Sequence, residues 1–135
     1  TGETAAIYES FKKSLDTSLL VGLDPVTMLR MYKQAEMEQE FEVLHALMPS
    51  TVSLHNYSLA DIKNLFINPL ETRTKREIES MYASSYNKLV DAKVQSIVPK
   101  TYANVEYYYG KIREGYMTQR MHYNAQGFWE LLLYN

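Results

Sequence analysis

Glu42 and His45 form the spacing in this chain that comes closest to a metal-ligand pattern. Di-metal carboxylate bundles use two such Glu-x-x-His pairs, one on each of two facing helices. The nearest second candidate surrounds His122, where Gln119 occupies the glutamate position and is a poor ligand for hard cations. On a helical wheel started at Val26, Glu42 and His45 lie about 100–160° away from the apolar stripe. We therefore expect a solvated acidic flank and no bound metal.

The rest of the chain contains few residues or motifs of the kinds that enzymes use for catalysis. The sequence has three histidines, no cysteine, and none of the glycine-rich phosphate loops or Gly-x-Ser-x-Gly turns that hold nucleotides or catalytic serines. The absence of cysteine excludes disulfides, thiolate zinc sites, iron–sulfur clusters and thiol nucleophiles. The seven methionines are spread along the chain, as core residues that fill gaps are. We predict a protein that is not an enzyme and needs no cofactor.

Acidic and basic residues are unevenly divided between the two halves of the chain. Residues 1–62 hold nine acidic and four basic side chains, whereas residues 63–135 hold seven and ten, and the net charge is −2. Basic side chains interleaved with tyrosines suit phosphate neutralisation and base stacking. The candidate nucleic-acid contacts are Arg73, Lys75, Arg76, Lys88, Lys93, Lys100, Lys111, Arg113 and Arg120. The alternative interpretation is an ordinary solvated surface, because six acidic residues are mixed into the same region.

Local start and stop signals predict that helices carry these residues. Asp24-Pro25 is an N-cap followed by proline at the first helical position, and Asn68-Pro69 repeats the device. Pro99 is expected to separate two further helices. No alternation of apolar and polar residues persists long enough to predict a strand. The expected helices are at about 3–21, 25–48, 58–66, 69–97 and 102–132, with loops at 22–24, 49–57, 67–68 and 98–101.

The predicted fold is a single all-α domain over residues 1–135, an elongated bundle of about four to five helices with the last two longest. At about 1.5 Å per residue, the helix expected at 69–97 would extend about 42 Å and would cross the molecule. The stripe expected to be buried on the helix at 25–48 comprises Val26, Leu29, Met37, Phe41, Leu44, Leu47 and Met48.

Tyrosines dominate the apolar face predicted for the last helix. Nine of the twelve tyrosines lie in the final 54 residues. A tyrosine ring packs well but its hydroxyl needs a partner, which suits a wet or partner-covered interface. The candidate subunit-interface residues are Tyr108, Tyr109, Tyr116, Tyr123, Phe128, Trp129 and Leu132. Two alternatives remain open, namely an ordinary core that uses Tyr in place of Phe, and a C-terminal segment that packs on its own chain.

These features favour a non-enzymatic structural subunit that self-assembles, as helical coat or capsid proteins do, with nucleic acid as a further candidate partner. The expected partners are copies of this chain or a related subunit, in a virion or other large assembly, otherwise in the cytoplasm. The alternative is an α-helical accessory or adaptor subunit of a hetero-oligomeric complex without nucleic acid. Neither a membrane-spanning segment nor a secretory leader is expected, because no apolar run approaches about 20 residues and no basic segment precedes one.

Overall fold

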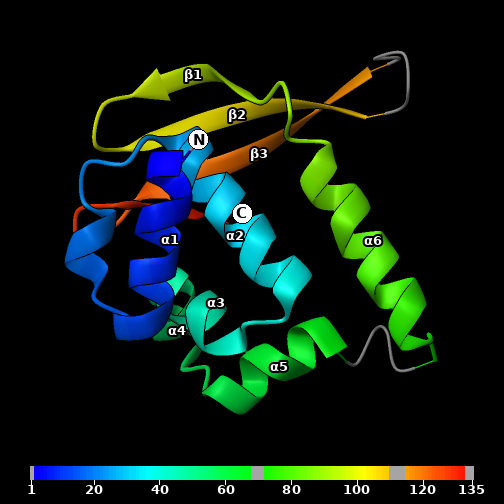
Figure 1. Ribbon diagram of the computed structural model, residues 1–135. Coiled ribbons are helices and arrows are strands. Elements are labelled where there is room, and N and C mark those ends of the chain that lie inside the picture. The colour runs from blue at the N-terminus through cyan, green and yellow to red at the C-terminus, as the bar shows by residue number, and fades with distance from the viewer. Residues whose placement is uncertain (1, 68–71, 110–114, 133–135) are drawn as a thin grey trace.

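The chain folds as a layer of helices packed against one face of a four-stranded antiparallel sheet (Figure 1). This arrangement is that of a computed structural model, which describes residues 2–67, 72–109 and 115–132, and leaves aside the side chains of residues 66–67, 108–109 and 115–116. The prediction of an all-α fold is therefore wrong, and so is the elongated helical bundle, because the fold mixes helices with a sheet.

Helices occupy the first two thirds of the chain. In order they are α1 Gly2–Ser14, the 3-10 turn η1 Thr17–Leu20, α2 Pro25–Glu38, α3 Phe41–Leu47, α4 Pro49–His55, α5 Leu59–Ile67 and α6 Lys75–Asn87. The predicted start of α2 is confirmed, because the Asp24 carboxylate accepts a hydrogen bond from the Thr27 amide at 2.8 Å and Pro25 is the first helical residue. The cap predicted at Asn68-Pro69 lies outside the described residues.

The helix predicted at 25–48 is interrupted and becomes α2 and α3. Gln39 adopts a left-handed φ of 57°, and its amide closes the end of α2 on the carbonyl of Glu36 at 3.1 Å. The Glu40 amide completes this end on the carbonyl of Ala35 at 2.9 Å. Of the predicted stripe, the buried members are Leu29, Leu44, Leu47 and Met48, and the partly buried ones are Val26, Met37 and Phe41.

Helix α4 replaces most of the loop predicted at 49–57. Pro49 occupies the first position of α4, where the missing proline amide leaves no helical hydrogen bond unmade. Asn56 then ends α4 with a left-handed φ of 52°. The proline therefore begins a helix here as well as separating it from α3.

The sheet is formed by the last third of the chain. Its strands are β1 Lys93–Val98, β2 Tyr102–Tyr109, β3 Gly115–Tyr123 and β4 Trp129–Leu131, in the order β1-β2-β3-β4, and each pairs antiparallel with the next. The helix predicted at 102–132 is therefore wrong, and the one predicted at 69–97 is wrong at residues 72–74, which are not helical, and beyond Asn87. Helix α6 has 13 residues, which corresponds to about 20 Å at the helical rise and not to the about 42 Å expected from the sequence.

Strand pairing explains why this segment is not helical. On β2, Ala103 and Val105 are buried, whereas Tyr102 and Asn104 alternate with them and are partly exposed. This is the period of two that a strand requires. Valine, isoleucine and tyrosine fit a pleated sheet well once a neighbouring strand supplies the hydrogen bonds, so tertiary pairing outweighs the weak helical pattern.

Pro99, which was expected to separate two helices, lies in the turn of the hairpin between β1 and β2. The Thr101 amide donates to the Val98 carbonyl at 3.1 Å, and Lys100 takes a left-handed φ of 53°. Proline in the second position of such a tight turn is favoured because its φ is already set. Pro99 therefore reverses the chain between two strands and does not divide two helices.

The core lies between α2 and the inner face of the sheet. Met28 and Met31 of α2 are buried in the same cluster as Val105 of β2 and Met121 of β3. Burial of each such side chain contributes about 1.5–3 kcal/mol. Among the described helices we find none with the length and apolar character that a membrane crossing would require.

Candidate functional site

Strand β1 is an edge strand, and within the described residues it pairs with β2 alone. All six of its side chains are exposed. Val94, Ile97 and Val98 keep 36%, 48% and 39% of their surface in contact with solvent. An edge strand presents unpaired amide and carbonyl groups to any strand that can lie beside it. Of the described elements, β1 is therefore the one best placed to pair with a second chain.

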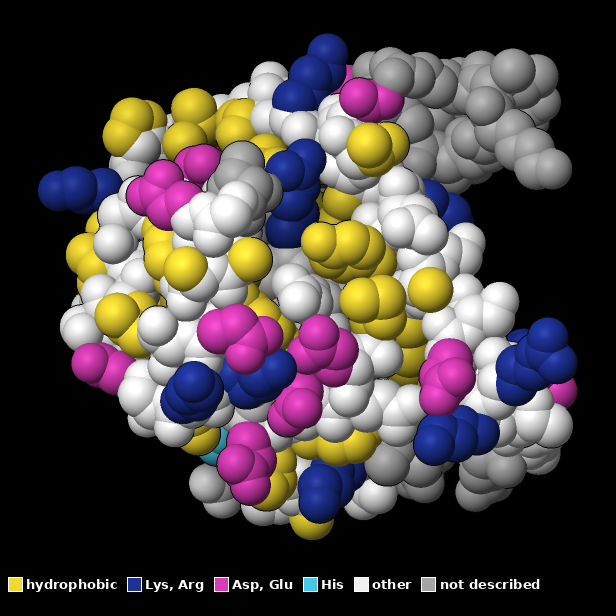
Figure 2. All heavy atoms as spheres, viewed as in Figure 1, with side chains coloured by type: hydrophobic (Ala, Val, Ile, Leu, Met, Phe, Trp, Pro, Cys, Tyr) yellow, Lys and Arg dark blue, Asp and Glu magenta, His cyan; other side chains and the backbone are white. Residues whose placement is uncertain are grey.

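The helical layer packs against the inner face of the sheet, and α2 contacts both β1 and β2 (Figure 1). Val105 and Ala103 are fully buried, whereas Val94 and Ile97, their register partners on β1, are exposed. Figure 2 shows hydrophobic side chains gathered over this end of the sheet, at the upper left. The apolar side chains and the open backbone edge thus form one surface, which we call the β1 edge and define as Lys93–Val98.

The outer face of the sheet is polar and bonded within itself. Lys93 Nζ lies 3.4 Å from Glu106 Oε2, and Gln95 Nε2 donates to Oε1 of the same carboxylate at 3.4 Å. The Arg120 guanidinium lies 4.3 Å from the centre of the Tyr102 ring, in a cation–π contact. Because these charges already have partners, the outer face offers less to a ligand than the β1 edge does.

The predicted nucleic-acid contacts do not form one track in the part of the chain that the structure describes. Arg73, Lys75 and Arg76 lie at the start of α6, and Lys88 lies at its other end, about 20 Å away. Lys93 lies on β1, Lys100 in the β1–β2 turn and Arg120 on β3, whereas Lys111 and Arg113 lie outside the described residues. Nucleic-acid contact stays a prediction.

The predicted interface residues lie partly in the chain's own core. Phe128 and Trp129 are 0% and 6% exposed, and the Trp129 ring meets the Tyr123 ring edge-on with 5.2 Å between centroids. Tyr123 and Leu132 are partly buried. The side chains of Tyr108, Tyr109 and Tyr116 lie outside the described residues. The C-terminal segment therefore packs on its own chain as far as Leu132.

The Glu-x-x-His spacing leads to no metal cluster among the residues that the structure describes. Glu42 is exposed, and His45 Nε2 lies 3.4 Å from the Tyr57 carbonyl oxygen. Gln119 and His122 are on strand β3, where residues three apart point to opposite faces of the sheet. Within the described ranges, no group of three or more His, Cys, Asp or Glu side chains could hold a metal ion.

Glu130 is a buried carboxylate that joins β4 to α4, and no pattern in the sequence indicates its role. The side chain is on a residue only 1% exposed, and it accepts hydrogen bonds from the Ser50 amide at 3.1 and 3.2 Å and from Asn124 Nδ2 at 3.0 Å. His122 Nε2 lies 3.4 Å from the same carboxylate. Helix α4 has no capping side chain of its own at Met48, so Glu130 satisfies its first turn from 80 residues away.

Glu36 is another buried carboxylate, on the side of α2 that faces α6 and the sheet. It is 8% exposed, and Lys33 Nζ lies 3.7 Å from its Oε1. Burial raises the pKa of Glu36, and the charge of Lys33 opposes this rise. Burial, and then the Glu36 charge, raise the pKa of Tyr82 to about 12, and the same two causes raise the pKa of Tyr107. These tyrosines therefore stay protonated at neutral pH and do not supply a phenolate.

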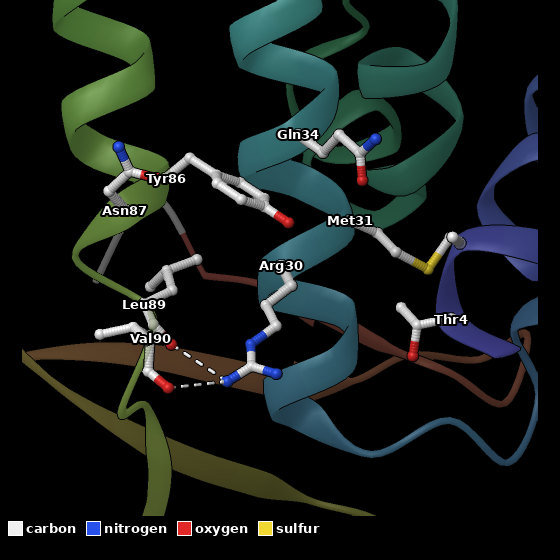
Figure 3. A pocket seen from close by; sticks show the side chains of 9 residues that line it. Thr4, Arg30, Met31, Gln34, Tyr86, Asn87, Leu89 and Val90 are labelled. Carbon is white, nitrogen blue, oxygen red and sulfur yellow. Dashed lines mark hydrogen bonds between the residues drawn. The ribbon is translucent and has the colours of Figure 1, made fainter. Parts of the chain in front are cut away.

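A pocket of about 310 Å³ lies between α1, α2 and the end of α6 (Figure 3). Arg30 of α2 is its charged lining residue, and Nη2 of Arg30 donates to the carbonyl oxygens of Leu89 and Val90 at 3.1 and 3.5 Å. The remaining walls include Tyr86 and Gln34. No local pattern in the sequence indicates this pocket, because its lining residues come from three segments that are far apart along the chain.

Compared with known proteins, the chain matches no family model, no curated protein and no solved structure.

Proposed function

We propose that this protein is a non-enzymatic structural subunit that self-assembles by pairing its β1 edge with the β1 edge of a second copy. The observation that supports the proposal is a strand exposed along its whole length, with apolar side chains beside an open backbone edge. Pairing of this kind would join the two sheets into one. It would also remove Val94, Ile97 and Val98 from water, where each loses part of its exposed apolar surface.

The residues of β1 suit antiparallel pairing with themselves. If two copies pair about the midpoint between Gln95 and Ser96, Val94 of one copy lies opposite Ile97 of the other. Apolar pairs directly opposite each other stabilise a sheet by about 0.2–1 kcal/mol each. Lys93, the charged residue of the strand, is then at opposite ends of the paired strands, so the two like charges stay apart.

Two features of the β1 edge limit pairing with unrelated strands. The register with β2 shifts between Val94 and Ser96, which marks an irregularity of the bulge type. Lys93 places a charge at the start of the strand. Both features reduce pairing with unrelated strands. We therefore propose pairing with a second copy of this chain in one register.

Self-pairing about a two-fold axis closes on itself and gives a dimer. The dimer would be the building unit of a larger assembly such as a coat, which needs a second contact elsewhere on the subunit. In such an assembly the basic side chains at the start of α6, Arg73, Lys75 and Arg76, are the candidates for contact with nucleic acid.

The test is the oligomeric state of the wild-type chain and of Ile97→Lys, measured by sedimentation velocity from about 10 µM to about 1 mM. We expect wild-type dimers whose dissociation constant rises about tenfold or more in Ile97→Lys, because the substitution places a charge opposite an apolar side chain on both sides of the two-fold.

The matched control is Leu54→Lys, which changes an equally apolar side chain that is 76% exposed on α4, away from the β1 edge. Its dissociation constant should equal that of the wild type. A wild-type chain that remains monomeric throughout the range would contradict the proposal and favour the accessory-subunit alternative. Equal dimerisation of Ile97→Lys and the wild type would contradict it as well.

A further inference from the structure

The pocket between α1, α2 and the end of α6 contains an arginine whose charge is not neutralised by the described part of the chain. Arg30 forms no ion pair with a described carboxylate. Its bonds go instead from Nη2 to the Leu89 and Val90 carbonyl oxygens. These bonds hold the guanidinium plane in place, and Figure 3 shows the other terminal nitrogen pointing away from them toward the side of Thr4. Nη1 is thus available to an acceptor from outside the chain.

Neutral polar groups also line the pocket. Gln34 uses Nε2 to donate to Glu38 Oε2 at 3.2 Å, so its amide is held by a partner outside the pocket. Tyr86 extends from α6 toward α2, on the side where Arg30 and Gln34 project (Figure 3). A few polar groups that converge in a mainly apolar pocket are what small-molecule sites usually contain.

Several residues that line the pocket are apolar. Met31 and Leu89 are 0% and 2% exposed. Val90 has 77% of its surface exposed, and Ala5 of α1 also lines the pocket. A ligand with a short hydrocarbon part would cover Val90 and so gain the free energy of removing apolar surface from water.

We infer that this pocket binds a small organic carboxylate with a short apolar chain, with the carboxylate on Nη1 of Arg30 and the chain against Met31 and Val90. The hydrogen bond from Nη1 to a carboxylate is charge-assisted and therefore stronger than one between neutral groups. Arg30 supplies one positive charge to the lining, so a monoanion is matched and a doubly charged phosphate ester is not. The pocket volume of about 310 Å³ is at the lower end for ligand sites, which restricts the ligand to a small one.

The test is titration of the isotope-labelled full chain with hexanoate, 1-hexanol, hexylammonium and inorganic phosphate, followed by amide chemical shifts. We expect hexanoate to shift the amides of Arg30, Leu89 and Val90 in a saturable way, and the other three probes to bind at least about tenfold more weakly. Binding of hexanol or hexylammonium as tight as that of hexanoate would overturn the proposal. Phosphate binding as tight as that of hexanoate would overturn the choice of a carboxylate.

Two pairs of variants test whether hexanoate binds in this pocket. Arg30→Gln should weaken hexanoate binding at least about tenfold, whereas Arg73→Gln, an exposed arginine outside the pocket, should leave it unchanged. Ala5→Leu fills the pocket without removing any Arg30 contact, so it remains informative if Arg30→Gln does not fold. Its control is Ala6→Leu, on the neighbouring exposed position of α1 that does not line the pocket. Wild-type affinity in Ala5→Leu would overturn the proposal.

Discussion

At the scale of single residues, Glu130 shows how a buried charge can organise a fold. Its carboxylate accepts hydrogen bonds from a helix amide and a side-chain amide, and an imidazole nitrogen lies 3.4 Å away. A buried carboxylate is costly unless it is bonded in this way. Once it is bonded, each donor in turn depends on it, so removal of the carboxylate leaves several buried polar groups without partners.

We therefore predict that Glu130→Ala lowers the free energy of unfolding by about 2–4 kcal/mol, because the Ser50 amide and the Asn124 side chain lose their acceptor. Urea unfolding followed by Trp129 fluorescence would measure the change. Glu9→Ala is the control, since the Glu9 side chain is 54% exposed and its loss should change stability by less than about 0.5 kcal/mol. Equal stabilities of the two variants would show that the Glu130 network does not support the fold.

Glu36 should make stability depend on pH in the opposite sense to most carboxylates. Burial raises its pKa in the folded state, so the folded state binds the proton more tightly than the unfolded chain does. The contribution of Glu36 to stability is then fully present below the unfolded pKa and is lost as pH rises through the folded pKa.

Glu36→Gln removes this titration, and so the stability of the variant relative to the wild type should increase as pH rises from about 4 to about 7. Denaturant unfolding at the two pH values would measure the difference. Glu79→Gln is the control, because Glu79 is an exposed glutamate on α6. A relative stability of Glu36→Gln that falls over this range would contradict the assigned direction of the shift.

At the scale of elements, α6 begins at a cap formed by neighbouring residues and ends beside the pocket that Arg30 lines. Thr74 Oγ1 accepts from the Glu77 amide at 3.2 Å and donates to Glu77 Oε1 at 3.2 Å, which is a reciprocal cap. The last turn leads to Leu89 and Val90, whose carbonyl oxygens hold Arg30. The position of α6 therefore determines the shape of the pocket.

Loss of this cap should destabilise the protein by a small amount. Thr74→Ala is expected to lower the free energy of unfolding by about 1 kcal/mol, because the Glu77 amide loses its acceptor. Thr72→Ala, two residues earlier and also exposed, has no capping position and should leave stability unchanged. Thermal unfolding would separate the two variants, and identical midpoints would show that the cap contributes nothing.

At the scale of the whole molecule, two sources of self-association make different predictions about salt. The acidic N-terminal and basic C-terminal halves suggest electrostatic contact, which salt weakens. The β1 edge contributes one charged residue, Lys93, and its ion-pair partner Glu106 lies on the same chain. Pairing through this edge depends instead on backbone hydrogen bonds and apolar side chains.

If the proposed function is correct, the dissociation constant of the dimer should change by less than about threefold between about 0.1 M and about 0.5 M sodium chloride. Sedimentation equilibrium at the two salt concentrations would measure it. A much steeper weakening would point to contact between the oppositely charged halves of two chains and would count against pairing through the β1 edge.

What the sequence determined by itself is local. The cap at Asp24 depends on the Thr27 amide three residues away, and the start of α2 was predictable for that reason. The absence of catalytic motifs is also a property of the sequence alone. Of the apolar stripe expected near α2 and α3, four of the seven residues are buried, because burial follows the apolar character of each side chain.

The tertiary structure decided the rest, since it depends on partners that are distant along the chain. Residues from Lys93 to Leu131 form a sheet only when each strand has a neighbour. Without that neighbour, the tyrosines and valines of β2 are compatible with the period of a helix as well as that of a strand. Glu130 caps α4 across 80 residues, and Arg30 reaches Leu89 across 59. Neither contact leaves a spacing in the sequence that a local pattern could detect, because the energy of such contacts is realised only after the chain has folded.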